Sequence, residues 1–230
     1  MGYIADLLGM ALRAIYEMIG SYGLAIIVFT IIIKLILTPL TVKQTKSTFA
    51  MSEISPKIKE IQAKYKNKPE KQNEEIQKIY KESGVNPMAG CLPLLVQMPI
   101  LFALFYVFRE PLKHGVFDTK QAFDLANGSF LWFHSLVKPD IPLAILSGIS
   151  GFFMQLVMTP KDQMQGPMKS MLYIMPAMSL FWGLTFPAAL TLYWTISNLF
   201  SIVQFYVVTK PLKRKLEDGK SDKLNGRKAK

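Results

Sequence analysis

Apolar residues gather in several long stretches of this chain. The first, residues 23–41, reads GLAIIVFTIIIKLILTPLT. An α-helix rises about 1.5 Å per residue, so about 20 apolar residues cross a hydrocarbon layer of roughly 30 Å. The stretch is therefore predicted to be a transmembrane helix. It carries one charged residue, Lys34, close to its middle.

Lys34 is the most informative residue of this span. A lysine at the centre of a membrane helix costs about 2.5–3.5 kcal/mol on insertion scales, and such residues usually face a bundle interior or a water-filled cavity. Thr30 and Thr38 lie one helical turn on either side of Lys34 and share its face. This polar face predicts that the Lys34 side chain meets water and has a functional role. In the alternative, the aliphatic stem of Lys34 carries its charge to the membrane surface and the residue has no special role.

Four further apolar stretches are predicted to cross the membrane. They are residues 91–108, 141–159, 170–186 and 188–208. Pro93 and Pro99 lie inside the second span, where neighbouring helices are expected to bond the freed backbone carbonyls. The third span contains Ser147, Gly148, Ser150 and Gly151, small residues that permit close helix contact. The predicted fold class is an all-α polytopic membrane protein with five transmembrane helices.

Residues 1–22 are too polar to span, yet their apolar positions recur at i, i+3 and i+4. This pattern predicts an amphipathic helix lying in the extracytoplasmic membrane interface, or, as an equal alternative, an ordinary packed helix. Residues 109–140 are predicted to form an extracytoplasmic loop, and residues 160–169 a short cytoplasmic loop.

Residues 42–90 are strongly polar and contain two helical patterns, so they predict a cytoplasmic helical hairpin. Pro39 is expected to end or kink the preceding helix, and Pro69 suits the start of the second hairpin helix. The apolar stripe is narrow, which predicts a mobile hairpin. Its 10 lysines against 6 glutamates suit anionic lipid or RNA. In the alternative, this charge is only a solvated surface.

Composition and charge distribution support a membrane protein and indicate its orientation. Half of the residues are hydrophobic, the mean hydropathy is +0.24 and the formal net charge is +11. Of the 27 Lys and Arg residues, 10 lie in 42–90, 2 in 160–169 and 9 in 210–230. By the positive-inside rule these segments are cytoplasmic, with the N-terminus outside and the C-terminus inside. This orientation requires an odd number of spans.

The remaining features are a basic tail and a single cysteine. The cytoplasmic tail, residues 209–230, is low in apolar residues and is predicted to be disordered. Because Cys91 is the only cysteine, the chain contains no disulfide framework and no cysteine-based metal site.

Polar side chains also occur inside the other predicted spans. Gln97 lies in the second span and Gln155 in the third. In the fifth span one helical face carries Thr191, Trp194, Asn198 and Ser201. This face is the natural partner for Thr30 and Lys34. Alternatively, each of these groups only bonds one helix to another.

Several motifs together resemble the YidC/Oxa/Alb family of membrane protein insertases. They are the lysine-bearing span ending in TPLT, the segment NPMAGCLPLLVQMPI after the hairpin, MQLVMTP, and LYWTISNLFSIVQ. The resemblance covers nearly the whole chain in order. It implies a five-helix membrane core with a cytoplasmic helical hairpin, and an insertase and chaperone that acts alone or with the Sec translocon.

The resemblance also implies a site and a mechanism. Family members hold a central basic residue in a polar groove that opens to the cytoplasm and to lipid. The matching positions here are Thr30, Lys34, Gln155 and Trp194. The full expected groove is Lys34, Thr30, Thr38, Gln97, Gln155, Trp194, Asn198 and Ser201. No bond is made or broken in insertion, so we expect neither an enzyme nor a cofactor or metal.

Two departures from the family pattern concern the charge and the length. Bacterial members typically carry arginine where this chain has Lys34, which keeps the charge but loses the planar guanidinium. The first span has no large extracytoplasmic domain or lipoprotein-like signal before it, so the chain resembles a short bacterial member. The expected location is the bacterial plasma (inner) membrane.

The expected partners are nascent membrane proteins, the Sec translocon, anionic lipids, and the ribosome through the basic tail and the hairpin. Two other classes compete with this interpretation. A small transporter or channel would use Lys34 as an ion or proton site, but such proteins usually show internal repeats and several intramembrane charges. A polybasic lipid or ribosome anchor would explain the hairpin and the tail but would leave the groove residues without a role.

Overall fold

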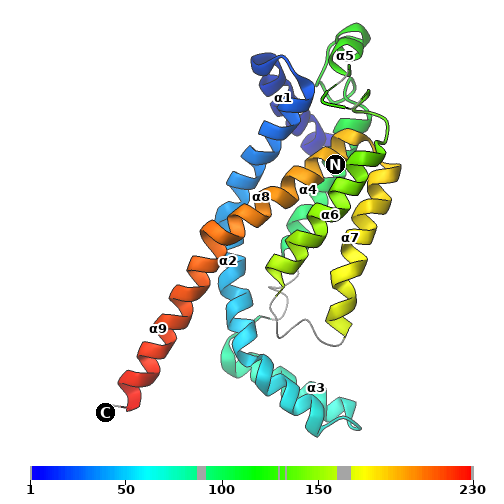
Figure 1. The fold of residues 1–230 in the computed structure, drawn as a ribbon. Coiled ribbons are helices and arrows are strands. Elements are labelled where there is room, and N and C mark those ends of the chain that lie inside the picture. The colour runs from blue at the N-terminus through cyan, green and yellow to red at the C-terminus, as the bar shows by residue number, and fades with distance from the viewer. Residues whose placement is uncertain (1, 87–91, 129, 133, 160–166, 229–230) are drawn as a thin grey trace. The chain divides into compact units, whose positions relative to one another are not determined.

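The computed structural model describes residues 2–86, 92–128, 130–132, 134–159 and 167–228. Within these residues the regular elements are helices (Figure 1). They are α1 (Gly2–Ile19), α2 (Tyr22–Lys64), α3 (Pro69–Ser83), α4 (Leu92–Arg109), α5 (Lys120–Ala126), α6 (Ile141–Met158), α7 (Pro167–Thr185), α8 (Ala188–Gln204), the π-helical turn η3 (Phe205–Thr209) and α9 (Lys210–Lys228). Cys91, and the predicted cytoplasmic loop as far as residue 166, lie outside the described residues.

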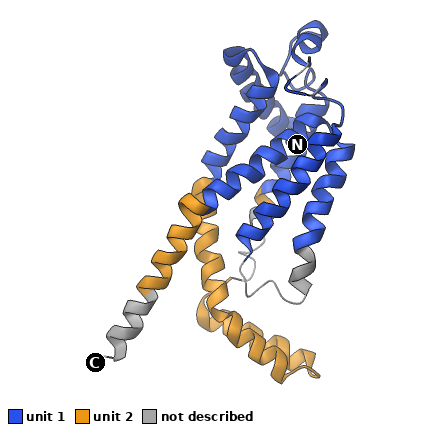
Figure 2. Cartoon of the chain, in the orientation of Figure 1, with its two compact units in different colours: residues 1–37, 97–205 blue, residues 38–96, 206–230 orange. Residues whose placement is uncertain are grey.

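The chain divides into two units of dense internal packing (Figure 2). The first consists of residues 1–37 and 97–205, and the second of residues 38–96 and 206–230. The division falls at three points: inside α2 between residues 37 and 38, inside α4 between residues 96 and 97, and at the start of η3 between residues 205 and 206. The first unit therefore contains Lys34 and most of the expected groove residues.

The core of the first unit is apolar and aromatic. Its largest fully buried side chains are Tyr22, Tyr193, Phe108, Leu12, Ile26, Leu104, Leu136, Leu143, Leu190, Val107 and Val116. Phe117 meets both Tyr16 and Tyr22 edge to face, with ring centroids 5.1 Å apart in each pair. Such pairs add about 0.5–1.5 kcal/mol to the burial of their area. This cluster joins α1, α2 and the loop after α4.

Helix α1 has one face packed on protein and another that stays apolar and exposed. Ala5, Gly9 and Leu12 are buried, whereas Leu7, Met10 and Met18 are more than half exposed. The packed face is held by Asp6, whose carboxylate lies 2.8 Å from His114 Nδ1. Arg13 adds a bidentate pair with Asp118, with Nη2 to Oδ2 at 2.6 Å. One face of α1 therefore packs against the protein. Its other face is apolar and exposed, so the placement of α1 in the membrane interface stays a prediction.

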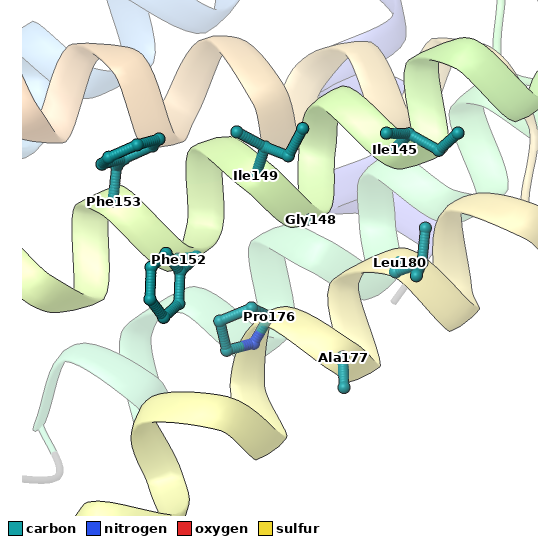
Figure 3. Close-up of a pocket in the computed structure, with 8 residues that line it drawn as sticks. All are labelled: Ile145, Gly148, Ile149, Phe152, Phe153, Pro176, Ala177 and Leu180. Atoms are coloured by element: carbon teal, nitrogen blue, oxygen red, sulfur yellow. The ribbon is translucent and has the colours of Figure 1, made fainter.

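Small residues allow α6, α7 and α8 to approach closely. A Cβ atom at Gly183 would lie 2.9 Å from Ala144 Cα and 3.1 Å from Thr191 Cγ2, so the three helices meet at this glycine. Gly148 lies against Leu180. Beside that contact, α6 and α7 leave an apolar pocket of about 400 Å³ (Figure 3), lined by Ile145, Gly148, Ile149, Phe152, Phe153, Pro176, Ala177 and Leu180. The prediction of close contact at Gly148 is confirmed.

Helix α2 passes through Pro39 without ending. It runs from Tyr22 to Lys64 with Pro39 and Pro56 inside it. Proline removes one backbone hydrogen bond and bends a helix, but the turns on both sides remain intact. The apolar span and the first hairpin helix are therefore one continuous helix.

The second hairpin helix, α3, begins at Pro69 as predicted and ends in a glycine cap. Gly84 has φ 61°, and the N–H of Val85 donates to the Tyr80 carbonyl, a Schellman-type ending. None of the 15 residues of α3 is buried. Lys78 bonds Glu74 and Glu75 at 3.0 and 2.8 Å and holds the pKa of Glu74 below its usual value. Exposed pairs of this kind are screened by water and salt and add little to stability.

Hydrogen exchange is expected to distinguish this hairpin helix from the core. The amides of α3 should exchange with opening free energies near zero, because the helix buries no side chain. Those of α8, which contains ten buried residues, should be strongly protected. Mass-spectrometric exchange on the protein in nanodiscs measures both helices together. Equal protection in α3 and α8 would show that the hairpin is docked and rigid.

The basic tail is helical, contrary to the prediction of disorder. Helix α9 covers Lys210–Lys228 and follows directly on η3. Forming the first turn is the costly step of helix formation, and a segment that continues an existing helix avoids it. Lys, Arg, Leu and Glu are also good helix formers. Low apolar content correctly excludes a packed domain here, but it does not exclude a helix extended from α8.

Candidate functional site

Lys34 lies on α2 and its ammonium group points to α8. Its Nζ donates a hydrogen bond to Ser201 Oγ over 3.0 Å. The Ser201 hydroxyl in turn donates to the Ser197 carbonyl at 2.8 Å, so its oxygen is free to accept from the lysine. Ser201 is buried and Lys34 half-buried. Residues 167 positions apart are thus joined within the first unit.

The two threonines that flank Lys34 in the sequence are in different situations. Thr30 is fully buried, and its hydroxyl donates to the Ile26 carbonyl of its own helix at 2.6 Å. Its hydrogen is therefore not available to a substrate in this conformation. Thr38 belongs to the second unit, whereas Lys34 and the other expected groove residues belong to the first.

Asn198 connects α8 to α6. Its Nδ2 donates to Ser150 Oγ at 3.2 Å, and the Ser150 hydroxyl donates to the Ser147 carbonyl at 3.0 Å. A Cβ atom at Gly151 would lie 3.5 Å from the same Asn198 nitrogen, so the glycine leaves room for the amide. Asn198 therefore acts as a bond between helices in this structure.

Gln97 makes a similar bond between α4 and α8. Its Nε2 donates to the Tyr193 hydroxyl at 2.9 Å. Tyr193 is 1% exposed, so this bond satisfies a phenol that is otherwise enclosed by the core. The periodicity of α8 does not reveal Tyr193, because it lies about 100° away from the face of Trp194.

Trp194 and Gln155 have other surroundings. The indole of Trp194 stacks on Trp182 of α7, with centroids 5.3 Å apart and planes at 16°. It also borders an aromatic pocket between α4, α7 and α8. Gln155 is half-buried near the end of α6, where its backbone carbonyl accepts the N–H of Thr159. None of these contacts of Trp194 or Gln155 involves Lys34.

The hydrogen bonds described above therefore do not join the expected groove residues into one connected network. Three of these bonds run separately to or from α8. Ser201 meets Lys34, Asn198 meets Ser150, and Tyr193 meets Gln97. Ser197 was not among the expected residues, although its place four residues before Ser201 marks it as the acceptor for a back-bonded hydroxyl. Among the described residues no three His, Cys, Asp or Glu side chains lie close enough to hold a metal ion.

The outward side of α2 around Lys34 is apolar. Ile31, Ile32, Leu35 and Ile36 are 37, 41, 57 and 70% exposed. The charge is therefore directed into the helix bundle, while the apolar side chains point away from it. This is the arrangement expected for an ionisable residue in a membrane span.

Comparisons with known proteins give a consistent result. The family model described as "60Kd inner membrane protein" matches residues 14–215. The chain is 40% identical to a "Membrane protein insertase YidC" of Clostridium perfringens, with 94% of each chain covered. It is 43% identical to that of Clostridium tetani, covering 85% of this chain and 84% of the relative.

Other relatives are much longer. The chain is 42% identical to the protein of the same name from Prosthecochloris aestuarii, covering 84% of this chain but only 34% of the relative. Among solved structures it resembles an "Active YidC insertase crystal structure with the first transmembrane domain resolved". There the TM-score is 0.67 at 28% identity, over 90% of this chain and 46% of that one.

Proposed function

The chain belongs to the 60Kd inner membrane protein family, that of the YidC membrane protein insertases, and on that basis we propose that it inserts integral membrane proteins and helps them to fold. Members of this family are not enzymes, and insertion needs no covalent step. The chain is a multi-pass membrane protein of the inner membrane.

The observation that carries the proposal is the inward-facing charge of Lys34. The ammonium is held by a buried serine on α8, and the outer side of the same helix is apolar and exposed. A half-buried positive charge attracts an acidic segment more strongly than the same charge in water, because the local dielectric is lower. The adjacent apolar surface suits the hydrophobic segment of the same client.

The proposed mechanism uses both sides of α2, the inward-facing charge and the apolar outer surface. A polar groove open to the cytoplasm, built around Lys34, Thr30, Gln155, Trp194 and the polar face of α8, shortens the apolar layer that a client's polar tail must cross. Lys34 attracts acidic groups of the tail, while the client's apolar segment moves out against lipid. The groove then empties without any chemical change in the protein.

Five membrane spans fit this mechanism. In the part of the chain that the structure describes, three helices are long and apolar enough to cross: Tyr22–Lys64, Ile141–Met158 and the run Ala188–Gly219. Two shorter apolar helices, Leu95–Arg109 and Leu172–Thr185, are the fourth and fifth spans in this proposal. With an odd number of crossings, the basic hairpin and tail lie in the cytoplasm and the N-terminus outside.

The partners in this proposal follow from charge. The hairpin and α9 present many lysines, which suit ribosomal RNA, anionic lipid headgroups or both. Nascent membrane proteins are the clients. Cooperation with the Sec translocon is a separate proposal that rests on the family resemblance alone.

The direct test is reconstitution into liposomes that contain no other protein. A small single-span client with an acidic tail should reach a protease-protected state in these liposomes and not in empty ones. An equal protected fraction in both would refute autonomous insertion. A client that inserts only after the Sec translocon is added would assign the protein an auxiliary role.

A further inference from the structure

A second apolar pocket lies between α4, α7 and α8, and of its lining residues only Trp194 belongs to the groove proposed above. Its volume is about 340 Å³, within the range of small-molecule sites. The lining residues are Met98, Leu101, Phe102, Phe105, Tyr106, Trp182, Phe186, Leu190 and Trp194. All of them belong to the first unit.

Aromatic rings give this pocket a fixed wall. Trp182 stacks on Trp194, and Phe186 stacks on both within 6.3 Å. Phe105 closes the group from α4, with its centroid 5.3 Å from that of Phe186. Interlocked rings leave few alternative rotamers, so the pocket is largely preformed.

A cation stands at one end of the pocket. Arg109 is the last residue of α4 and is exposed, and its guanidinium carbon lies 5.5 Å from the centre of the Phe105 ring. The next carboxylate along the chain, Glu110, is bonded to Lys113 at 3.1 Å. The ring of Phe105 therefore touches both the apolar interior and the charge at its edge.

We propose that this pocket binds one anionic phospholipid, with an acyl chain between the aromatic rings and the net negative headgroup, through its phosphate, on Arg109. A guanidinium matches phosphate oxygens with two parallel N–H donors. The pocket covers the stretch of α4 from Met98 to Tyr106, which at about 1.5 Å per residue is roughly 12 Å long. The part of an extended acyl chain nearest the headgroup fits along that length, and the lipid's own headgroup supplies the charge that complements Arg109.

The two pocket tryptophans provide the measurement. The chain has three tryptophans, and a Trp132→Phe variant leaves only Trp182 and Trp194 emitting. The purified full-length protein is reconstituted with phosphatidylglycerol or phosphatidylcholine whose acyl chains carry bromine, a short-range quencher. We expect phosphatidylglycerol to quench with about a fivefold higher relative affinity, which corresponds to about 1 kcal/mol per basic side chain at an anionic membrane surface.

Two variants on this background separate the headgroup from the chain. Arg109→Gln should abolish the preference for phosphatidylglycerol, whereas Lys120→Gln, the loss of an exposed charge outside the pocket, should keep it. Leu101→Phe, which adds volume to the pocket, should reduce quenching by both lipids. Circular dichroism confirms that each variant is folded.

Three results would overturn the proposal. One is equal affinity for both lipids in the protein with an intact Arg109. Another is a preference that persists in Arg109→Gln. The third is quenching in Leu101→Phe equal to that of the parent, which would mean that the bromine contacts the rings only from the surrounding bilayer. Loss of quenching when a client segment is added, with no headgroup preference, would assign the pocket to clients instead.

Discussion

Replacing Lys34 with alanine is expected to reduce the initial rate of insertion of an acidic-tailed client at least about tenfold. Two unit charges about 4 Å apart interact by roughly 4 kcal/mol at an effective dielectric of about 20. Since about 1.4 kcal/mol corresponds to tenfold in rate, a third of that attraction is enough. The rate is measured by protease protection in liposomes. Lys34→Arg keeps the charge and should retain most of the activity.

The design of the client and a second lysine make this test specific. When the tail carboxylates are changed to amides, wild type and Lys34→Ala should insert the client equally, because the attraction is then absent. Lys43→Ala removes a charge from the same helix beyond the span and should have little effect. If Lys34→Ala inserts the acidic client as fast as wild type, electrostatic capture is wrong for that client.

The helices of the membrane unit are predictable because each carries its own signal. The apolar length of residues 23–41 and the spacing of Gly148 and Gly151 act locally, and the structure places them in a helix and in close interhelical contact. The start of α3 is equally local, since proline at the first helical position loses no hydrogen bond.

The departures occur where one element continues another. Pro39 is predicted to end or kink its helix and lies inside a continuous one, and low apolar content predicts disorder after residue 209, where a helix that is already formed continues. Because nucleation is the unfavourable step, a neighbouring helix outweighs a weak local preference. A prediction from local composition treats each segment as if it had to nucleate its own helix.

The site residues are only partly predictable for a different reason. Periodicity correctly groups Trp194, Asn198 and Ser201 on one face of α8, but that face meets different neighbours along its length: α7, α6 and α2. The crossing of helices, which depends on contacts such as Gly183 with Ala144, decides which partner each residue meets. One sequence contains no direct record of those crossings.

The contact of α1 with the rest of the first unit predicts a large effect from a single methyl group. A Cβ atom at Gly9 would overlap the carbonyl oxygen of His114, which is backbone and cannot rotate away. Gly9→Ala is therefore expected to lower the free energy of unfolding by about 1–3 kcal/mol, the usual cost of overpacking. Thermal unfolding in detergent measures it as a lower Tm.

Two comparison variants identify close packing as the cause. Gly2→Ala adds the same methyl to the same helix where no atom lies within 4 Å, so it should leave the Tm nearly unchanged. Arg13→Ala removes the solvent-screened pair with Asp118 and should lower the Tm only slightly. If ion pairs hold α1 in place, Arg13→Ala will lower the Tm more than Gly9→Ala does. The overlap at His114 predicts the opposite order, because displacing a buried backbone contact separates the whole packed face of Ala5, Gly9 and Leu12 from its neighbours.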